Sequence, residues 1–246
     1  MQTENKKKII GILLTYKNAH TVENIYSILP KNVFDEIIIF DDAGKDGIED
    51  TAKKLNLPIF VQPKNLGYGG NVKYALRKCV ERGAEYMMEI HGDGQYGADS
   101  IIPGLEKMRQ GYDFVLGSRF TSIGQAREDK MPLLTYLANR GLSFFDRLIL
   151  QLPLSEFHTG FRVYSRKLVE TIDFKNTNNN HLFSFQIIAL AKYYNLKIGE
   201  VPVRCDYSKD HTSIPFNQAA EYALKTFGVL YQYLLAKIGI KNTLFH

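Results

Sequence analysis

The sequence predicts an α/β protein built on a mostly parallel central sheet with helices on both faces, and three observations support this. Short apolar runs alternate with amphipathic segments along the chain, which is the pattern of repeated β-α units. The runs are apolar at consecutive positions, as expected for strands that are covered on both faces. Turns rich in Asp and Gly follow several of these runs directly. The 246 residues suit one large domain, or a domain with a helical extension.

Predicted strands and helices alternate through the first half of the chain. Pro30 ends the first helix, for which Thr21 is the predicted cap, and Asp99 or Ser100 is expected to cap the fourth. The strands are expected at 8–14, 36–40, 58–62, 86–90 and 114–116, and the helices at 21–29, 48–55, 71–82 and 100–110.

The second half carries longer helices and more polar connections. A turn at 156–162 leads into a strand, and 175–181 is a polar loop. Helices are expected at 133–152, 184–194 and 216–238, with a strand at 197–203. The first and last of these helices are rich in large apolar residues, so they belong to the core, to a homodimer interface or against a bilayer.

The composition excludes several classes of protein. The net charge of +5 suits a protein that binds anions, but the basic residues are not interleaved with aromatic ones, so we expect no nucleic acid partner. Two cysteines indicate a reducing compartment rather than a disulfide scaffold. The first residues lack the apolar core of a signal peptide, and no uncharged apolar run reaches about 20 residues. We therefore expect a cytoplasmic protein, either free or peripheral on the cytoplasmic face of a membrane.

Acidic turns lie after the predicted strands, at Asp41-Asp42, Asp46 and Asp93. Parallel strands place their carboxyl ends at one edge of the sheet, which is where open α/β sheets bind ligands. One acid can accept a hydrogen bond from a base or ribose while another holds a metal on the phosphates, which favours a nucleoside diphosphate ligand. Helix capping is the alternative, and it suits Asp46 better than the adjacent, mutually repelling pair Asp41 and Asp42.

The stretch 86–96 changes abruptly from an apolar run to the turn His91-Gly92-Asp93-Gly94-Gln95. The glycines let the backbone turn sharply beside the Asp93 carboxylate. Oxygen donors from Asp93 and Gln95 suit Mg²⁺ or Mn²⁺. A tight turn with a solvated aspartate is the alternative.

Other nucleotide-binding motifs are absent from the sequence. The run Gly67-Tyr68-Gly69-Gly70 fails the G-x-G-x-x-G pattern because Val72 stands at the third glycine position, and no G-x-x-x-x-G-K-[ST] loop occurs. The segment 15–18 also lacks the Gly-rich, Arg-containing loop expected of a nucleotide-sugar pyrophosphorylase.

Seven stretches in fixed order resemble family 2 glycosyltransferases, in particular the branch that includes the dolichol-phosphate and polyprenyl-phosphate sugar transferases. They are LTYKN at 14–18, IIIFDDAGKDG, NLGYGGN, HGDGQY, GSRF, EFHTGFRVYS and EVPV. The resemblance implies a GT-A fold, with a catalytic domain at 1–205 and, in the same unit, a lid loop and amphipathic helix at 206–246. His91 replaces the first acid of the D-x-D pattern, and Asn18 stands where the family often has Glu.

The resemblance also implies roles for individual residues. Asp93 and Gln95 are implied at the metal, a Mg²⁺ or Mn²⁺ ion. The catalytic residues are expected to be Asp93, Glu156 and Arg119. The expected substrate-binding residues are Thr15, Tyr16, Asn18, Asp42, Asp46, Asn65, Gly67, His91, Gly92, Arg162 and Lys209. Arg162 is included because a planar guanidinium matches phosphate oxygens.

The expected activity is inverting transfer of a sugar from a UDP- or GDP-linked donor. A hydroxyl acceptor needs a general base, for which Glu156 and His158 are candidates, whereas a lipid phosphate is already an anion at neutral pH. A polyprenyl or dolichyl phosphate is therefore the favoured acceptor. The alternatives are a glycan hydroxyl in surface polysaccharide synthesis, or an inactive nucleotide-binding scaffold of a membrane complex.

Overall fold

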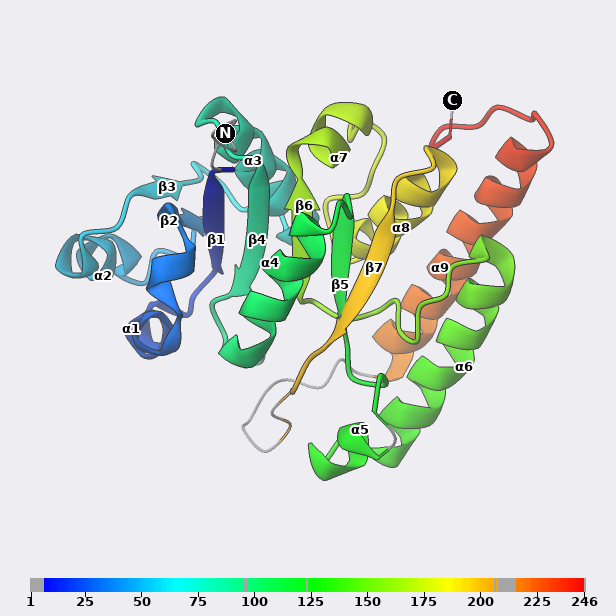
Figure 1. Cartoon of the computed structure of the whole chain (residues 1–246), viewed down its shortest axis with the longest axis horizontal. Helices are drawn as coiled ribbons and strands as arrows, with labels where there is room; N and C mark the ends of the chain where they lie inside the picture. The colour runs from blue at the N-terminus through cyan, green and yellow to red at the C-terminus, as the bar shows by residue number, and fades with distance from the viewer. Residues whose placement is uncertain (1–6, 95–96, 123, 206, 208–215, 246) are drawn as a thin grey trace, which may run out of the picture.

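A computed structural model describes residues 7–94, 97–122, 124–205, 207 and 216–245. Within these residues the chain forms one sheet with the strand order β3-β2-β1-β4-β6-β5-β7 (Figure 1). The strands are β1 (Ile9–Thr15), β2 (Glu36–Asp41), β3 (Ile59–Val61), β4 (Tyr86–His91), β5 (Phe114–Ser118), β6 (Arg162–Ser165) and β7 (Ile198–Pro202).

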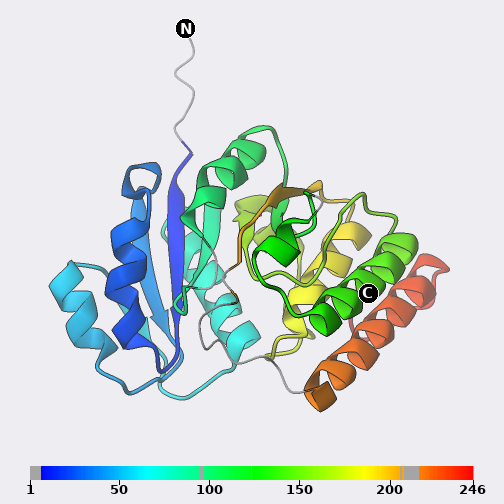
Figure 2. The same cartoon turned by 90° about the horizontal axis from the view of Figure 1, so that it is seen from below.

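Helices cover both faces of this sheet. They are α1 (Ala19–Ile28), α2 (Ile48–Leu55), α3 (Tyr68–Glu81), α4 (Ile101–Arg109), α5 (Gln125–Glu128), α6 (Leu133–Leu150), α7 (Arg166–Thr171), α8 (Phe183–Tyr193) and α9 (Phe216–Lys237), with 3-10 turns η1 (Lys31–Val33) and η2 (Ala98–Ser100). Residues of α1, α2 and α4 share one core with their face of the sheet, and residues of α3, α7, α8 and α9 share the other. Figure 2 shows the two layers from below.

Burial follows directly from the apolar runs. Every residue of β1 is buried, and β2 is buried from Ile37 onward. Side chains alternate between the faces, so Ile10 and Ile12 enter the core that α3 covers while Ile9 and Leu13 enter the core of α1 and α4. These strands are apolar at consecutive positions because helices cover both faces of the sheet.

Strand β6 is the exception to the parallel arrangement, because it pairs antiparallel with both β4 and β5. The strands β1, β2, β3 and β4 are parallel neighbours, and β5 is parallel to β7. The carboxyl ends of β1, β2, β4, β5 and β7 therefore lie at one edge of the sheet, together with the amino end of β6.

The predicted fold class is confirmed, and most element ends lie within two residues of expectation. Three details differ. Asn18 rather than Thr21 precedes α1, and the Thr21 hydroxyl instead donates to the carbonyls of Asn18 and Gly92. The Ser100 hydroxyl donates to Pro202 and does not cap α4. The short helices α5 and α7 were not predicted. The division at residue 205 adjoins residues outside the described ranges and stays a prediction.

Helices α6 and α9 lie side by side at the end of the molecule remote from α1 and α2 (Figures 1 and 2). The α6 helix turns Ser143, Asp146 and Leu150 inward, while several of its leucines and phenylalanines are exposed. In the part of the chain that the structure describes, neither these helices nor any other is long and apolar enough to cross a bilayer.

Candidate active site

The acidic turns predicted to converge do lie at one edge of the sheet. Asp41 ends β2 and is paired in register with Thr15 at the end of β1, while His91 at the end of β4 is paired with Leu14. Strand β1 therefore separates the Asp41-Asp42 turn from the Asp93 turn, which places their starting points about 10 Å apart, two strand spacings.

The carboxylates of Asp41 and Asp42 bind different parts of the chain: Asp41 binds Thr15 and its own turn, and Asp42 binds the segment before α3. The buried Asp41 carboxylate accepts the Thr15 hydroxyl at 3.0 Å and the Gly44 amide at 2.8 Å. The Asp42 carboxylate accepts the backbone amides of Leu66 at 2.7 Å and Gly67 at 2.9 Å. Asp42 is 4% exposed, and each of its oxygens keeps a second acceptor position.

The turn after β1 is tied to both acidic turns. The Asp46 carboxylate accepts the Ala19 amide at 2.7 Å, so it caps α1 rather than the helix that follows it in sequence. Asn18 accepts the Tyr16 amide at 3.0 Å, and a Cβ on Gly92 would come within 2.7 Å of Asn18 Nδ2. The Tyr16 ring is 46% exposed, in a position to meet a ligand at this edge.

The glycine-rich segment at the start of α3 serves a packing role. A Cβ on Gly67 would lie 2.6 Å from the Asn179 carbonyl oxygen, and one on Gly69 would lie 2.6 Å from the Phe183 Cβ. These glycines let the polar loop at 175–181 rest against the start of α3. Asn65 ties this segment to the turn after β2, because its side-chain amide donates to the Asp42 carbonyl at 3.3 Å.

Asp93 is an exposed residue in the turn after β4. Gly92 fixes this turn to β1, because its amide donates to the Leu14 carbonyl at 3.0 Å. His91 points inward instead. Its Nε2 lies 2.9 Å from the Gly160 carbonyl oxygen and 3.2 Å from Glu89 Oε1. A carbonyl oxygen can only accept, so Nε2 carries a proton and cannot ligate a metal in this arrangement.

A buried polar cluster lies beneath this turn. The Glu89 carboxylate accepts the Tyr68 hydroxyl at 2.5 Å and the Tyr164 hydroxyl at 2.6 Å, in addition to its contact with His91. Burial opposes its charge, but the hydrogen bond and charge of His91, helped by Arg162, lower the pKa of Glu89. Burial and the adjacent Glu89 charge raise the pKa of Tyr68 well above its ordinary value. Glu89 is therefore held as a buried carboxylate.

The same cluster sets the charge of His91. Burial lowers the pKa of His91, but the hydrogen bond and charge of Glu89, together with the charge of Asp93, outweigh this and raise it. The rings of His91, Tyr68 and His181 form a stacked row, with centroids 6.0 Å and 5.0 Å apart. The row links the Asp93 turn to the polar loop that packs on α3.

Arg162 is enclosed by the protein rather than presented to a ligand. It is fully buried, and its guanidinium donates to the carbonyls of Thr159 and Ser184, the latter at 2.6 Å. The predicted substrate-binding role of Arg162 therefore finds no support in this placement. From this buried position, the positive charge of Arg162 helps to lower the pKa of Glu89.

Arg119 and Glu156 form a buried ion pair behind the end of β5. Arg119 Nε donates to Glu156 Oε1 at 2.7 Å, its backbone amide donates to Glu156 Oε2 at 2.7 Å, and Nη2 also contacts Oε1. Nη1 of Arg119 donates to the Tyr207 hydroxyl. Glu156 is fully buried and its charge is paired with the Arg119 guanidinium, an arrangement that does not suit a general base.

His158, the other candidate base, is also enclosed. Its Nε2 lies 2.9 Å from Asp146 Oδ2 on α6, and its Nδ1 lies 3.1 Å from the Tyr222 hydroxyl on α9. The ring stacks on Phe185, with centroids 5.6 Å apart. His158 therefore connects α6, α8 and α9 to the loop before β6.

Two predicted site residues, Gln95 and Lys209, lie outside the described residues. Three residues of the buried cluster, Glu89, Tyr68 and Tyr164, were not predicted from the sequence. Glu89 did carry a signal, because it is one charged residue inside an otherwise apolar strand and such a residue is rarely buried without partners.

Comparison with known proteins defines the class to which this fold and site belong. Residues 12–173 match the model of glycosyl transferase family 2. The chain belongs to this family, and it is a glycosyltransferase with a GT-A fold.

Two curated relatives and one solved structure are similar over most of the chain. The UDP-N-acetylglucosamine–dolichyl-phosphate N-acetylglucosaminyltransferase of Methanococcus voltae is 25% identical, covering 95% of this chain and 97% of the relative. The undecaprenyl-phosphate mannosyltransferase of Micrococcus luteus is 24% identical, covering 80% and 82%. Glucosyl-3-phosphoglycerate synthase from Mycobacterium tuberculosis, solved with Mn²⁺, UDP-glucose and phosphoglyceric acid, has a TM-score of 0.67 at 17% identity, covering 96% of this chain and 81% of that one.

Proposed function

We propose that this protein transfers a sugar from a nucleoside diphosphate donor to a polyprenyl or dolichyl phosphate, with inversion at the anomeric carbon. The observation that carries the proposal is the pair of acidic turns, at Asp42 and Asp93, on either side of the end of β1. The names of the two curated relatives, each a transferase to a lipid phosphate, support the choice of acceptor.

The donor would lie along the carboxyl edge of β2, β1 and β4. Asp42 would accept a hydrogen bond from the UDP or GDP part, and its two amide contacts hold it in place. Tyr16 would provide an exposed ring beside it. Thr15, Asn18, Asp46, Asn65, Gly67 and Gly92 would shape the edge through the hydrogen bonds and close contacts described above, and His91 would hold the turn of Asp93.

Asp93 fits a Mg²⁺ or Mn²⁺ ion that is shared with the donor. Such an ion commonly binds one or two carboxylates together with substrate phosphates. Asp93 is an exposed aspartate at the carboxyl edge of the sheet. No group of three or more His, Cys, Asp or Glu side chains that could hold a metal occurs among the described residues, so the diphosphate would have to complete the ligands. The ion would neutralise charge that develops on the leaving diphosphate.

The acceptor phosphate needs no base from the protein. One of its oxygens forms a bond to the anomeric carbon while the bond from that carbon to the diphosphate breaks, and the electron pair leaves with the nucleoside diphosphate. A phosphate monoester has a second pKa of about 6, so it attacks as an anion at neutral pH. The enclosed positions of Glu156 and His158 favour this acceptor over a glycan hydroxyl. Arg119, the other expected catalytic residue, is buried in its ion pair with Glu156, so it would not present its charge directly to the phosphate.

The test is a transfer assay on the full chain with Mn²⁺ and a panel of labelled UDP- and GDP-sugars. Polyprenyl phosphate is compared with polyprenol, the same lipid without its phosphate. We expect labelled sugar in the lipid extract with the phosphate and not with the alcohol. Equal transfer to the alcohol, or transfer to a glycan instead, would contradict the proposed acceptor. No transfer from any donor, with nucleotide still bound, would identify an inactive scaffold.

A further inference from the structure

The surface formed by α6 and α9 exposes many large apolar side chains. Its large side chains are between 40% and 73% exposed. We call this surface the α6–α9 face, and its members are Leu133, Leu134, Leu137, Phe144, Phe145 and Leu148 on α6, Leu224, Phe227, Tyr231 and Leu234 on α9, and Ile238 directly after α9. A soluble monomer rarely exposes a contiguous apolar patch of this kind unless the patch has a function.

Helical spacing explains why these side chains share one surface. On α9 they recur at intervals of three and four residues, which keeps them on one side of the helix. The opposite side of α9 carries Val229, Leu230, Tyr233 and Ala236, all of which are buried. Both sides of the helix are therefore apolar, one towards the core and one towards the outside.

The exposed sides of the two helices are continuous. The Phe145 ring of α6 meets the Phe227 ring of α9 with centroids 5.7 Å apart. A Cβ on Gly141 or on Gly228 would meet nothing within 4 Å, so the surface is open along both helices. The two helices lie side by side in both views (Figures 1 and 2).

The charged residues beside the face are mostly basic. Arg140 and Arg147 on α6, and Lys237 and Lys241 at the end of α9, are exposed. The acidic Glu221 on α9 is paired with Lys225. Apolar side chains bordered by cations fit a bilayer that contains anionic lipids. A second copy would add cations of its own to those already bordering the face, which makes it the less favoured partner.

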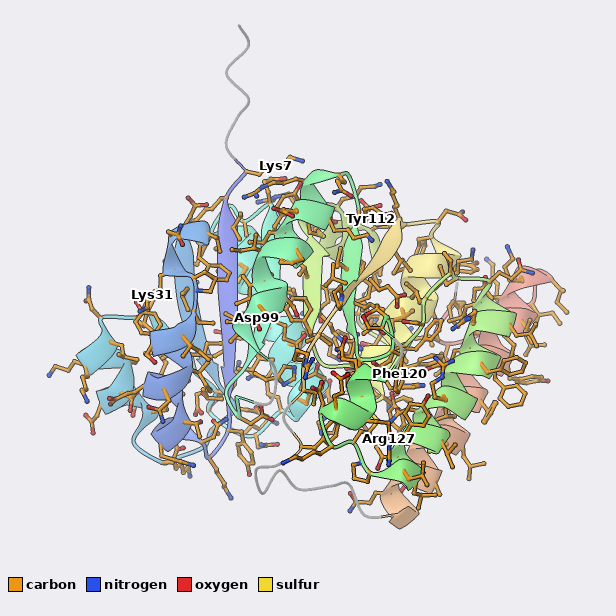
Figure 3. The ribbon with its side chains drawn as sticks, turned by 60° about the horizontal axis from the view of Figure 1, so that its bottom comes forward. Lys7, Lys31, Asp99, Tyr112, Phe120 and Arg127 are labelled. Carbon is orange, nitrogen blue, oxygen red and sulfur yellow. The ribbon has the colours of Figure 1, made fainter. Side chains whose placement is uncertain are left out.

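We propose that the α6–α9 face rests on the surface of an anionic lipid bilayer. The face adjoins Phe120, which follows Arg119 after β5 and is labelled in Figure 3. Phe120 contacts the Tyr136 ring and the Arg140 guanidinium, with centroid distances of 5.5 Å and 5.4 Å. A phosphate at the bilayer surface would then lie towards the carboxyl end of β5. This inference rests on the proposed function for its choice of partner.

Vesicle sedimentation of the full chain tests the inference without any donor. Vesicles of phosphatidylcholine are compared with vesicles that also contain phosphatidylglycerol. We expect binding to the anionic vesicles that weakens with added salt. The double variant Leu137→Ser and Leu148→Ser should bind at least about tenfold more weakly. Ile102→Ser changes an apolar position on α4 that is 47% exposed, against 56% for Leu137 and 64% for Leu148, and this control should bind like the original protein.

Three results would overturn the inference. They are absence of binding to anionic vesicles, equal binding by the double variant, and a dimer in lipid-free solution that the double variant converts to a monomer. Transfer to a short, water-soluble prenyl phosphate is measured in parallel. If that transfer proceeds while vesicle binding fails, the proposed function stands and only the membrane surface is wrong.

Discussion

Replacing Asp93 with Asn should lower the rate of sugar transfer at least about hundredfold, the loss typical of removing one electrostatic contact to developing charge in an active site. Asn keeps the size of the side chain but removes the negative charge that would hold the divalent ion. Asp93 is exposed in the turn after β4, so the substitution should leave the fold intact. The initial rate with saturating donor and Mn²⁺ measures the effect.

Asp99 provides the matched control for this experiment. It is an exposed aspartate on η2, a few residues further along the chain (Figure 3). Asp99→Asn should transfer at the original rate, and both variants should keep the circular dichroism spectrum of the original fold. Equal rates for Asp93→Asn and the unaltered protein would rule out the catalytic role of Asp93.

Replacing Glu156 with Ala should lower the free energy of unfolding by about 3–5 kcal/mol, because Arg119 would be left as an uncompensated buried charge. Glu156 is fully buried and accepts three donors from Arg119, two of them on the guanidinium. Chemical denaturation, followed by a spectroscopic signal of the fold, measures the loss.

Glu128 offers the comparison for an exposed ion pair. It lies 3.5 Å from Arg204, and its side chain is 66% exposed. Glu128→Ala should change the free energy of unfolding by less than about 1 kcal/mol, as is usual for surface pairs. If Glu156→Ala were as mild as Glu128→Ala, the pair with Arg119 would not be the structural anchor that its geometry indicates.

The arrangement of the acidic turns could be predicted from the sequence because it follows from strand direction alone. Apolar runs ending in Asp-Gly turns placed Asp42 and Asp93 at one edge once the strands were taken as parallel. The antiparallel direction of β6 could not be predicted, because the four residues Arg162–Ser165 carry no signal that distinguishes a parallel strand from an antiparallel one. Its insertion between β4 and β5 depends on packing between distant segments.

Side-chain direction was the part that the sequence did not reveal. His91 and Arg162 look like ligand-binding residues in a linear motif, yet both turn towards Glu89 or the carbonyls around it. The partner that draws them inward lies on a strand of apolar residues, where a charged side chain is easily overlooked. Similarly, Asp46 caps α1, a contact between residues 27 positions apart.

The central claim is that Asp42 and Asp93 hold one donor between them, and calorimetry of UDP and GDP binding with and without Mn²⁺ tests it most directly. Asp42→Ala should weaken nucleotide binding about tenfold or more whether or not Mn²⁺ is present, as expected for the loss of a hydrogen bond to a charged group. Asp93→Asn should leave binding without metal unchanged and abolish the gain that Mn²⁺ provides. Unaltered affinity in Asp42→Ala, or a full Mn²⁺ gain in Asp93→Asn, would contradict the account.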